Sequence, residues 1–294
     1  MTGGGEMTVP SEPSSRPSIG AALPERGILP FIGVFDSFSA SIAARHYDAL
    51  FVSGFGFAAS YYGLPDIGFI TWTDILSFVH RLKAVLPDHL LLVDIDDGYT
   101  DEEVAVHVVK RLDRAGASGV VLEDQQRPRR CGHFEGKQLL EPEAYLQKLK
   151  RVLDARGDLF VIARTDASEP EDIEERVRAY AAAGADAVLA DGIRDLELLT
   201  RIARSVDKPV AFNQIAGGKS PMCTLTELED AGASLAIYST PCLFAAQSAI
   251  EASLTTLKDA DGRLPSGDGA VGVRDCTALL EANLEGAEAP PVAP

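Results

Sequence analysis

Two apolar runs of this chain end in carboxylic acids. The run Leu90–Val93 is followed by Asp94 and Asp96, and the run Gly119–Leu122 is followed by Glu123. Buried strands that end in carboxylates are unfavourable unless a cation or a hydrogen-bond donor lies beside them. Mg²⁺ prefers oxygen ligands and keeps several waters, so one direct carboxylate is sufficient when the others bind through water. We therefore predict a site for Mg²⁺, or for Mn²⁺ in its place, with Asp96 as the direct ligand.

The second acid opens a segment that contains a cysteine. Cys131 follows a stretch that holds Arg127, Arg129 and Arg130. Neighbouring guanidinium groups favour the reactive thiolate form of a cysteine, so this segment is expected to be a catalytic loop. A free cysteine is ordinarily a small buried apolar residue. That role is expected for the other cysteines, Cys223, Cys242 and Cys276.

Composition limits the partners of the chain. It has 294 residues, of which 46% are hydrophobic, and a formal net charge of −17. So acidic a protein is not expected to bind nucleic acid or an anionic membrane, which leaves a small-molecule substrate. The cysteine spacing fits neither a metal site nor a disulfide framework. The lack of a signal peptide or a long apolar span makes the cytoplasm the expected location.

Short β-rich runs alternate with amphipathic helical stretches, which predicts parallel strands joined by right-handed crossovers. The helix over 102–115 has apolar residues at helical spacing, and Pro170 can open a helix that Gly184 closes. Eight such units predict a (β/α)8 TIM barrel rather than an open flavodoxin-like sheet. The predicted strands are Phe31–Phe35, Ala49–Ser53, Leu90–Asp94, Gly119–Glu123, Leu159–Arg164, Ala187–Asp191, Pro209–Asn213 and Leu235–Ser239.

Three regions are expected along the chain: a disordered tail over 1–25, a barrel domain over 26–258, and a linker, helix and loose tail over 259–294. Polar residues stand at or just beyond the C-terminal end of nearly every predicted strand. Because these ends meet at one mouth of a TIM barrel, where active sites are built, we expect them to share a pocket. They are Asp36, Ser53, Asp94, Asp96, Glu123, Arg164, Asp191, Asn213 and Tyr238.

The chain resembles the isocitrate lyase/phosphoenolpyruvate mutase superfamily over roughly residues 27–257. The resemblance is carried by ten motifs in order, among them Asp94–Tyr99, Arg130–His133, Ala163–Ala167 and Leu235–Tyr238. It implies an α/β barrel whose C-terminal helices are exchanged between subunits of a homodimer or homotetramer. The stretch Arg274–Leu284 would be the last such helix.

The resemblance also implies roles for individual residues. Cys131 would be the general acid that protonates the enolate left by carbon–carbon bond cleavage, and His133 would bind substrate or orient the loop. The general base is left open between Tyr99, an acid and a metal-bound water. Arg164 would bind a substrate carboxylate through paired hydrogen bonds. The remaining substrate contacts are expected from Ser53, Gly54, Phe55, Asp66, Asp191, Asn213 and Ser239, with Asp36 and Asp66 also reaching the metal through water.

Several residues depart from the pattern usual in the superfamily, and because they gather at one pocket they predict a different substrate shape. They are Phe55, the Tyr61–Tyr62 pair, Ile95, Asp97, Thr100, Asp191 and Ser239. The leading hypothesis is a Mg²⁺-dependent carbon–carbon lyase, similar to 2-methylisocitrate lyase, for a small 2-hydroxy or 2-oxo di- or tricarboxylate. The alternatives are a phosphonomutase or phosphonopyruvate-type enzyme, an oxaloacetate hydrolase, and a metabolite-binding barrel without catalysis.

Overall fold

The computed structural model describes residues 17–264 and 271–285. Eight parallel strands close into a barrel in the order β1-β10-β9-β8-β7-β4-β3-β2. All eight predicted strands are confirmed, with ends that agree to within two residues. They are β1 (Leu29–Val34), β2 (Ala49–Val52), β3 (Leu90–Asp94), β4 (Gly119–Glu123), β7 (Phe160–Thr165), β8 (Ala187–Ala190), β9 (Val210–Gln214) and β10 (Leu235–Tyr238).

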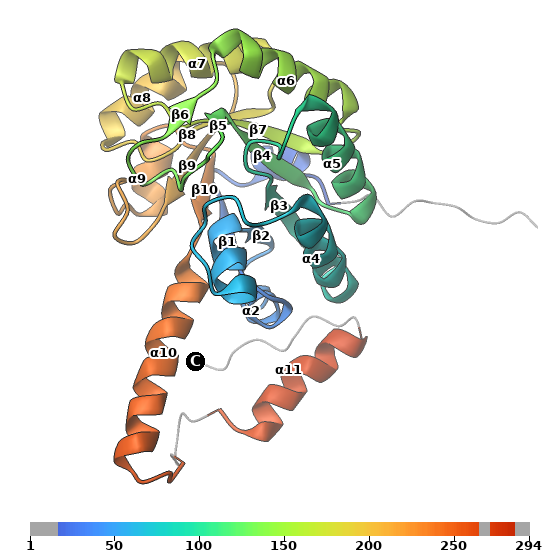
Figure 1. Ribbon diagram of the computed structural model, residues 1–294, viewed down its shortest axis with the longest axis vertical. Helices are drawn as coiled ribbons and strands as arrows, with labels where there is room; N and C mark the ends of the chain where they lie inside the picture. The colour runs from blue at the N-terminus through green and yellow to red at the C-terminus, as the bar shows by residue number, and fades with distance from the viewer. Residues whose placement is uncertain (1–16, 265–270, 286–294) are drawn as a thin grey trace, which may run out of the picture.

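A helix follows each barrel strand, which confirms the (β/α)8 fold (Figure 1). Several begin with side-chain caps, such as Asp101, which accepts a hydrogen bond from the amide of Val104 at 2.9 Å, a contact that satisfies an otherwise unpaired amide. The helices are α2 (Ser37–Ala43), α4 (Trp72–Val85), α5 (Glu102–Ala115), α6 (Pro142–Ala155), α7 (Pro170–Ala182), α8 (Leu196–Ser205), α9 (Leu225–Asp230) and α10 (Pro241–Asp259).

Shorter elements surround the mouth of the barrel. After β2 the chain forms α3 (Gly54–Phe57) and the π-helical turn η2 (Ala58–Tyr62). After β4 it forms a small antiparallel hairpin, β5 (Gln125–Gln126) and β6 (Gln138–Leu139). The predicted cysteine loop is the segment between these two strands, so a hairpin fixes both of its ends.

Two apolar clusters make the core. One lies between the strands and the surrounding helices, and the other fills the barrel interior with residues such as Phe31, Leu92 and Ile237. Ile19, fully buried, belongs to the interior cluster. It comes from helix α1 (Ile19–Ala22), which the 3-10 turn η1 (Leu23–Glu25) follows. The predicted disorder is therefore wrong for residues 17–25, and residues 1–16 lie outside the described part.

The last two helices follow the final strand of the barrel. Helix α10 runs away from it (Figure 1) and has no buried residue. The predicted helix over Arg274–Leu284 is present as α11 (Val273–Glu285), which packs against α2 of the same chain. Asn283 donates a hydrogen bond to Ser41 at 2.9 Å. The exchange of these helices between subunits stays a prediction. Within the described ranges, no helix is long and apolar enough to cross a membrane.

Candidate active site

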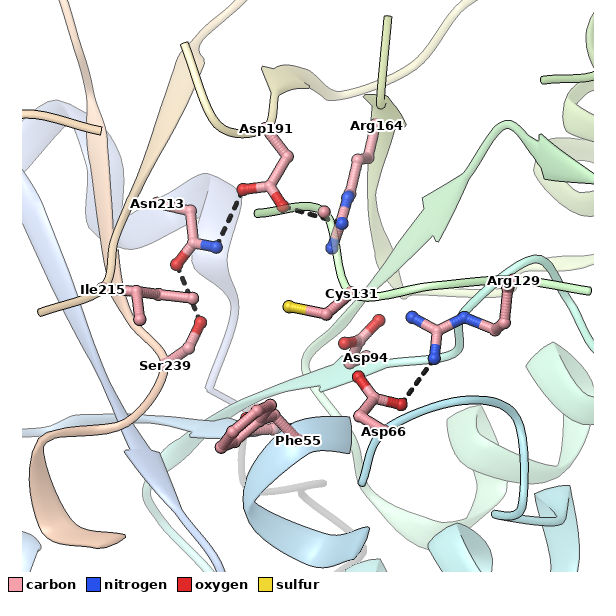
Figure 2. Close-up of a pocket in the computed structure, with 12 residues that line it drawn as sticks. Phe55, Asp66, Asp94, Arg129, Cys131, Arg164, Asp191, Asn213, Ile215 and Ser239 are labelled. Atoms are coloured by element: carbon pink, nitrogen blue, oxygen red, sulfur yellow. Dashed lines mark hydrogen bonds and ion pairs between the residues drawn. The ribbon is translucent and has the colours of Figure 1, made fainter. Parts of the chain in front are cut away.

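A pocket that is partly open to solvent lies at the C-terminal ends of the strands. Figure 2 shows Cys131 projecting into it, with Asp66 and Arg129 on one side and Asn213 and Ser239 on the other. Most of the predicted pocket residues meet here. The lining consists of Ser53, Phe55, Asp66, Asp94, Arg129, Cys131, Gly132, Arg164, Asp191, Asn213, Ile215 and Ser239.

Three carboxylates converge in front of Gly54. A Cβ atom built on this glycine would lie 3.4 Å from Asp94 Oδ2 and Asp96 Oδ1, and 3.9 Å from Asp66 Oδ2. The absence of a side chain at this position therefore leaves the space between the carboxylates open. Asp94 ends β3, and Asp96 follows two residues later at a left-handed φ of 50° that turns the chain toward the mouth.

These carboxylates fit a Mg²⁺ ion that keeps part of its water. Asp96 Oδ1 is buried and accepts no hydrogen bond from any described residue, although Arg129 Nη2 lies 3.2 Å away, so its capacity to accept a further contact is unused. Burial raises the pKa of both Asp94 and Asp96. Among the described residues, no three Asp, Glu, His or Cys side chains are grouped to ligate one ion directly. The arrangement agrees with one direct carboxylate, proposed to be Asp96, and water-mediated contacts to the others.

Arg129 lies among the same acids, and sequence reasoning missed this. Its guanidinium contacts Asp66 at 2.5 Å, Glu123 at 2.9 Å and Asp96 at 3.2 Å, and its side chain is only 1% exposed. Burial raises the pKa of Glu123 to about 7, although Arg129 and Arg164 oppose that rise. Glu123 is thus paired with Arg129, and it faces the proposed metal site less directly than the sequence predicted.

Arg164 stands at the centre of a second ion-pair cluster. It donates two hydrogen bonds of 2.9 Å to Asp166, and its Nη2 lies 2.7 Å from Asp191 Oδ2. Burial would raise the pKa of Asp191, but the guanidinium of Arg164 and the contact with His133 lower it below its ordinary value. Arg164 still lines the pocket, so the structural ion pairs and the proposed carboxylate contact coexist.

The side of the pocket opposite Asp66 and Arg129 is polar. Among the described residues, this side carries no unpaired cation. Ser239 donates to Asn213 Oδ1 at 2.7 Å, and Asn213 donates to Asp191 Oδ1 at 2.8 Å. Two apolar side chains, Phe55 and Ile215, complete this side. The ring of Phe55 meets that of Phe244 edge-on, with 6.2 Å between the ring centroids. Ile215 is a lining residue that the sequence analysis missed.

The cysteine loop packs closely against the ion-pair cluster centred on Arg164. A Cβ on Gly132 would come within 2.0 Å of Asp191 Oδ2 and 2.4 Å of Arg164 Nη2, so only glycine permits this approach. Lys137 donates to the carbonyl of Gly132. His133 Nδ1 accepts a hydrogen bond of 2.9 Å from the amide of Lys219. His133 is absent from the lining residues, so loop orientation is the role that fits it.

The predicted thiolate is wrong. Burial, reinforced by Asp191 and Asp66, raises the pKa of the Cys131 thiol to about 11. The loop arginines do not counter this rise, because Arg127 pairs with Asp97 and Arg129 with the metal-site acids. All four cysteines, Cys131 included, are partly rather than fully buried. A thiol with so high a pKa keeps its proton at neutral pH.

Two other predicted roles do not fit. Burial, together with Asp96 and Asp94, raises the pKa of Tyr99 well above its ordinary value. A phenol that holds its proton so firmly is not a general base, and Tyr99 does not line the pocket. Asp36 caps helix α2 by accepting from the amide of Ser39 at 2.6 Å, so the helix-capping alternative explains it.

The closed barrel and the charged pocket at the C-terminal ends of its strands define a TIM-barrel enzyme. A family model described as phosphoenolpyruvate phosphomutase matches residues 21–258. The chain belongs to this family, and it is an enzyme of the isocitrate lyase/phosphoenolpyruvate mutase superfamily, whose members include lyases and mutases.

Relatives of known activity span nearly the whole chain. The 2-methylisocitrate lyase of Aeropyrum pernix is 32% identical over 254 residues, which cover 84% of this chain and 81% of that protein. Among solved structures, 2,3-dimethylmalate lyase matches with a TM-score of 0.84 and 27% identity, covering 90% of this chain and 91% of its own. Oxaloacetate acetylhydrolase in complex with 3,3-difluorooxalacetate matches with a TM-score of 0.82 and 30% identity, covering 91% and 95%.

Proposed function

We propose that this protein is a divalent-metal-dependent carbon–carbon lyase that cleaves a small 2-hydroxy or 2-oxo carboxylate through an enolate. One observation carries the proposal: the partly buried thiol of Cys131, whose pKa burial raises to about 11, projects into the same pocket that converging carboxylates line. Bond cleavage in this chemistry leaves an electron pair on carbon, and that carbon must receive a proton. Cys131 has the position and the protonation state to supply it.

The chain's own groups account for substrate binding. The hydroxyl of Ser53 accepts a hydrogen bond of 3.2 Å from the amide of Gly56. The proton of this hydroxyl is therefore free to bind the 2-oxo acid end of the substrate. Arg164 binds a carboxylate of the substrate on the opposite wall. A divalent ion held by Asp96, with Asp94, Asp66 and Glu123 around it, would supply neutralisation of the developing oxyanion.

Because Tyr99 is not suited to the role of general base, an acid or a metal-bound water remains, and the acids of the pocket can be compared. Asp191 is held ionised by Arg164 and His133, and a carboxylate so stabilised is a weak base. Asp94 lines the pocket, and burial raises its pKa, so it is the better candidate.

The far side of the pocket narrows the substrate class. Asn213 is committed to Ser239 and Asp191, and Arg164, which is paired with Asp166 and Asp191, already serves one carboxylate of the substrate. No described lining residue is left to neutralise a third carboxylate there. Phe55 and Ile215 instead suit a short alkyl branch. The geometry therefore favours a dicarboxylate of the malate type over a tricarboxylate such as 2-methylisocitrate.

Cleavage of oxaloacetate is the second candidate. Its support is the likeness to oxaloacetate acetylhydrolase at 30% identity, together with the small polar end formed by Ser239 and Asn213. This reaction breaks a carbon–carbon bond with water as co-reactant. Carbon–phosphorus chemistry, suggested by the family description, would add a phosphonate dianion to a pocket already rich in carboxylates.

A substrate screen tests the proposal. Purified protein is incubated with Mg²⁺ or with chelator and offered 2,3-dimethylmalate, 2-methylisocitrate, oxaloacetate and phosphonopyruvate, and the products are identified by mass spectrometry. We expect Mg²⁺-dependent carbon–carbon cleavage of at least one of the first three, fastest for a dicarboxylate. Turnover of phosphonopyruvate alone, or equal rates with chelator, would overturn it.

A further inference from the structure

The segment that carries the metal-site acids has an unusual backbone. Between β3 and α5, Asp96, Gly98 and Tyr99 adopt left-handed φ angles of 50°, 79° and 75°. Only glycine takes this conformation readily, so the two other residues need outside contacts to hold them there. The source of those contacts shows what controls the position of Asp96.

The strongest outside contact comes from Arg127. Its Nε and Nη2 donate to the two carboxylate oxygens of Asp97, each at 2.8 Å, and Nε also donates to the carbonyl of Tyr99 at 2.6 Å. The Asp97 side chain is only 6% exposed, and Lys148 of α6 holds its carbonyl at 2.8 Å. Exposed ion pairs contribute little to stability, but paired hydrogen bonds from arginine to a buried carboxylate fix the relative orientation of the two groups.

Arg127 belongs to the cysteine loop. It follows strand β5 directly, and Cys131 lies four residues further along. Between them, Arg129 reaches Asp66 and Glu123 of the acidic cluster. The loop is therefore attached to the metal side of the pocket at two points, and the outer one is the Arg127–Asp97 pair.

We propose that the Arg127–Asp97 pair positions Cys131 over the pocket by fastening its loop to the metal-site segment. Neither residue lines the pocket, so both are positioning residues rather than catalytic ones. Breaking the pair frees the loop to leave the pocket, which exposes Cys131 and misplaces its proton. The effect on turnover rests on the proposed function, whereas the effect on cysteine exposure does not depend on any substrate.

The test compares Arg127→Gln, Asp97→Asn and the conservative Arg127→Lys with wild type. Arg130→Gln is the matched control, because Arg130 is an exposed arginine of the same loop whose recorded hydrogen bonds, to Gln125, use only its backbone. Alkylation of Cys131 by iodoacetamide is followed by mass spectrometry at mildly alkaline pH. We expect alkylation at least about tenfold faster in Arg127→Gln and Asp97→Asn, an intermediate rate in Arg127→Lys, and no change in the control.

The kinetic readout separates positioning from general stability. Displacing a group by about 1 Å costs up to about 10²-fold in rate, so kcat should fall by that order while KM changes little. Thermal melting identifies any variant that fails to fold, and Arg127→Lys then carries the test. Wild-type alkylation rates in folded Arg127 variants would overturn the proposal. Faster alkylation with an unchanged kcat would uphold the loop attachment and instead refute the proposed role of Cys131.

Discussion

Replacement of Cys131 by serine tests the proposed reaction at its central step. A thiol with a pKa of about 11 is deprotonated in only roughly one molecule in 10⁴ at neutral pH. Nearly every enzyme molecule therefore carries the proton that the enolate must receive. Serine preserves the size and hydrogen bonding of the side chain approximately, but its hydroxyl is a much weaker acid. The substitution removes the proton donor and leaves the pocket intact.

The structure sets the size of the expected effect. Loss of a positioned general acid lowers a rate by about 10²–10⁴-fold. Asp94 lines the same pocket and, as the proposed base, holds a proton after it has deprotonated the substrate hydroxyl, so its carboxyl remains as a substitute donor. We therefore expect a loss in kcat of about 10²–10³-fold, or about 2.7–4.1 kcal/mol of transition-state stabilisation.

The assay measures kcat at saturating substrate and Mg²⁺, and calorimetry measures substrate and Mg²⁺ affinity separately. Both affinities should stay within about threefold of wild type, because the thiol is not a proposed ligand of either. Cys223→Ser is the control, since Cys223 is partly buried but does not line the pocket. A Cys131→Ser enzyme that turns over at the wild-type rate would refute the assignment of Cys131 as the acid.

Three further predictions follow from the acids and from the C-terminal helices. Asp96→Asn should abolish Mg²⁺ binding and turnover without unfolding the protein; calorimetry that still detects the ion would contradict the ligand assignment. Because burial raises the pKa of Glu123 to about 7, its carboxylate forms as the pH rises, and Mg²⁺ affinity should increase from about pH 6 to about pH 8. The metal-free protein should lose stability as the pH rises through about 7, and melting curves can check this. Because α10 has no buried residue and Ile250 and Leu254 are 58% and 60% exposed, α10 and α11 should pack between subunits; a stable monomer in sedimentation at micromolar concentration would count against this.

The barrel could be predicted from the sequence because its signal is repeated. Each β/α unit has an apolar run and an amphipathic stretch, and eight weak signals in one order permit few folds. Helix α1 gave no such signal, since it has four residues within a Gly- and Pro-rich tail. Its structure depends on Ile19 entering the barrel interior, which is a tertiary contact without a local pattern.

The pocket residues could also be predicted, because a strand end fixes where a residue lies. Their partners could not, because a loop residue's neighbours depend on the path of the loop. Arg127, Arg129 and Arg130 look alike in the sequence, but the first meets Asp97, the second meets the metal-site acids, and the third is exposed. The prediction of a thiolate failed for this reason: proximity in sequence placed positive charge beside Cys131, and the fold directs it elsewhere.

The balance of charge in the pocket connects these results. Three cations, Arg129, Arg164 and Lys137, stand among six carboxylates: Asp66, Asp94, Asp96, Glu123, Asp166 and Asp191. Buried charge that is not offset is unfavourable, and for this reason burial raises the pKa values of Asp94, Asp96 and Glu123 and favours their protonated forms. A divalent ion can replace those protons, which couples its binding to pH. Each carboxylate of a substrate adds to the same negative excess. On the proposed function, a divalent ion would therefore have to bind before a dicarboxylate can bind well, and the described lining residues include no further cation to offset a third carboxylate.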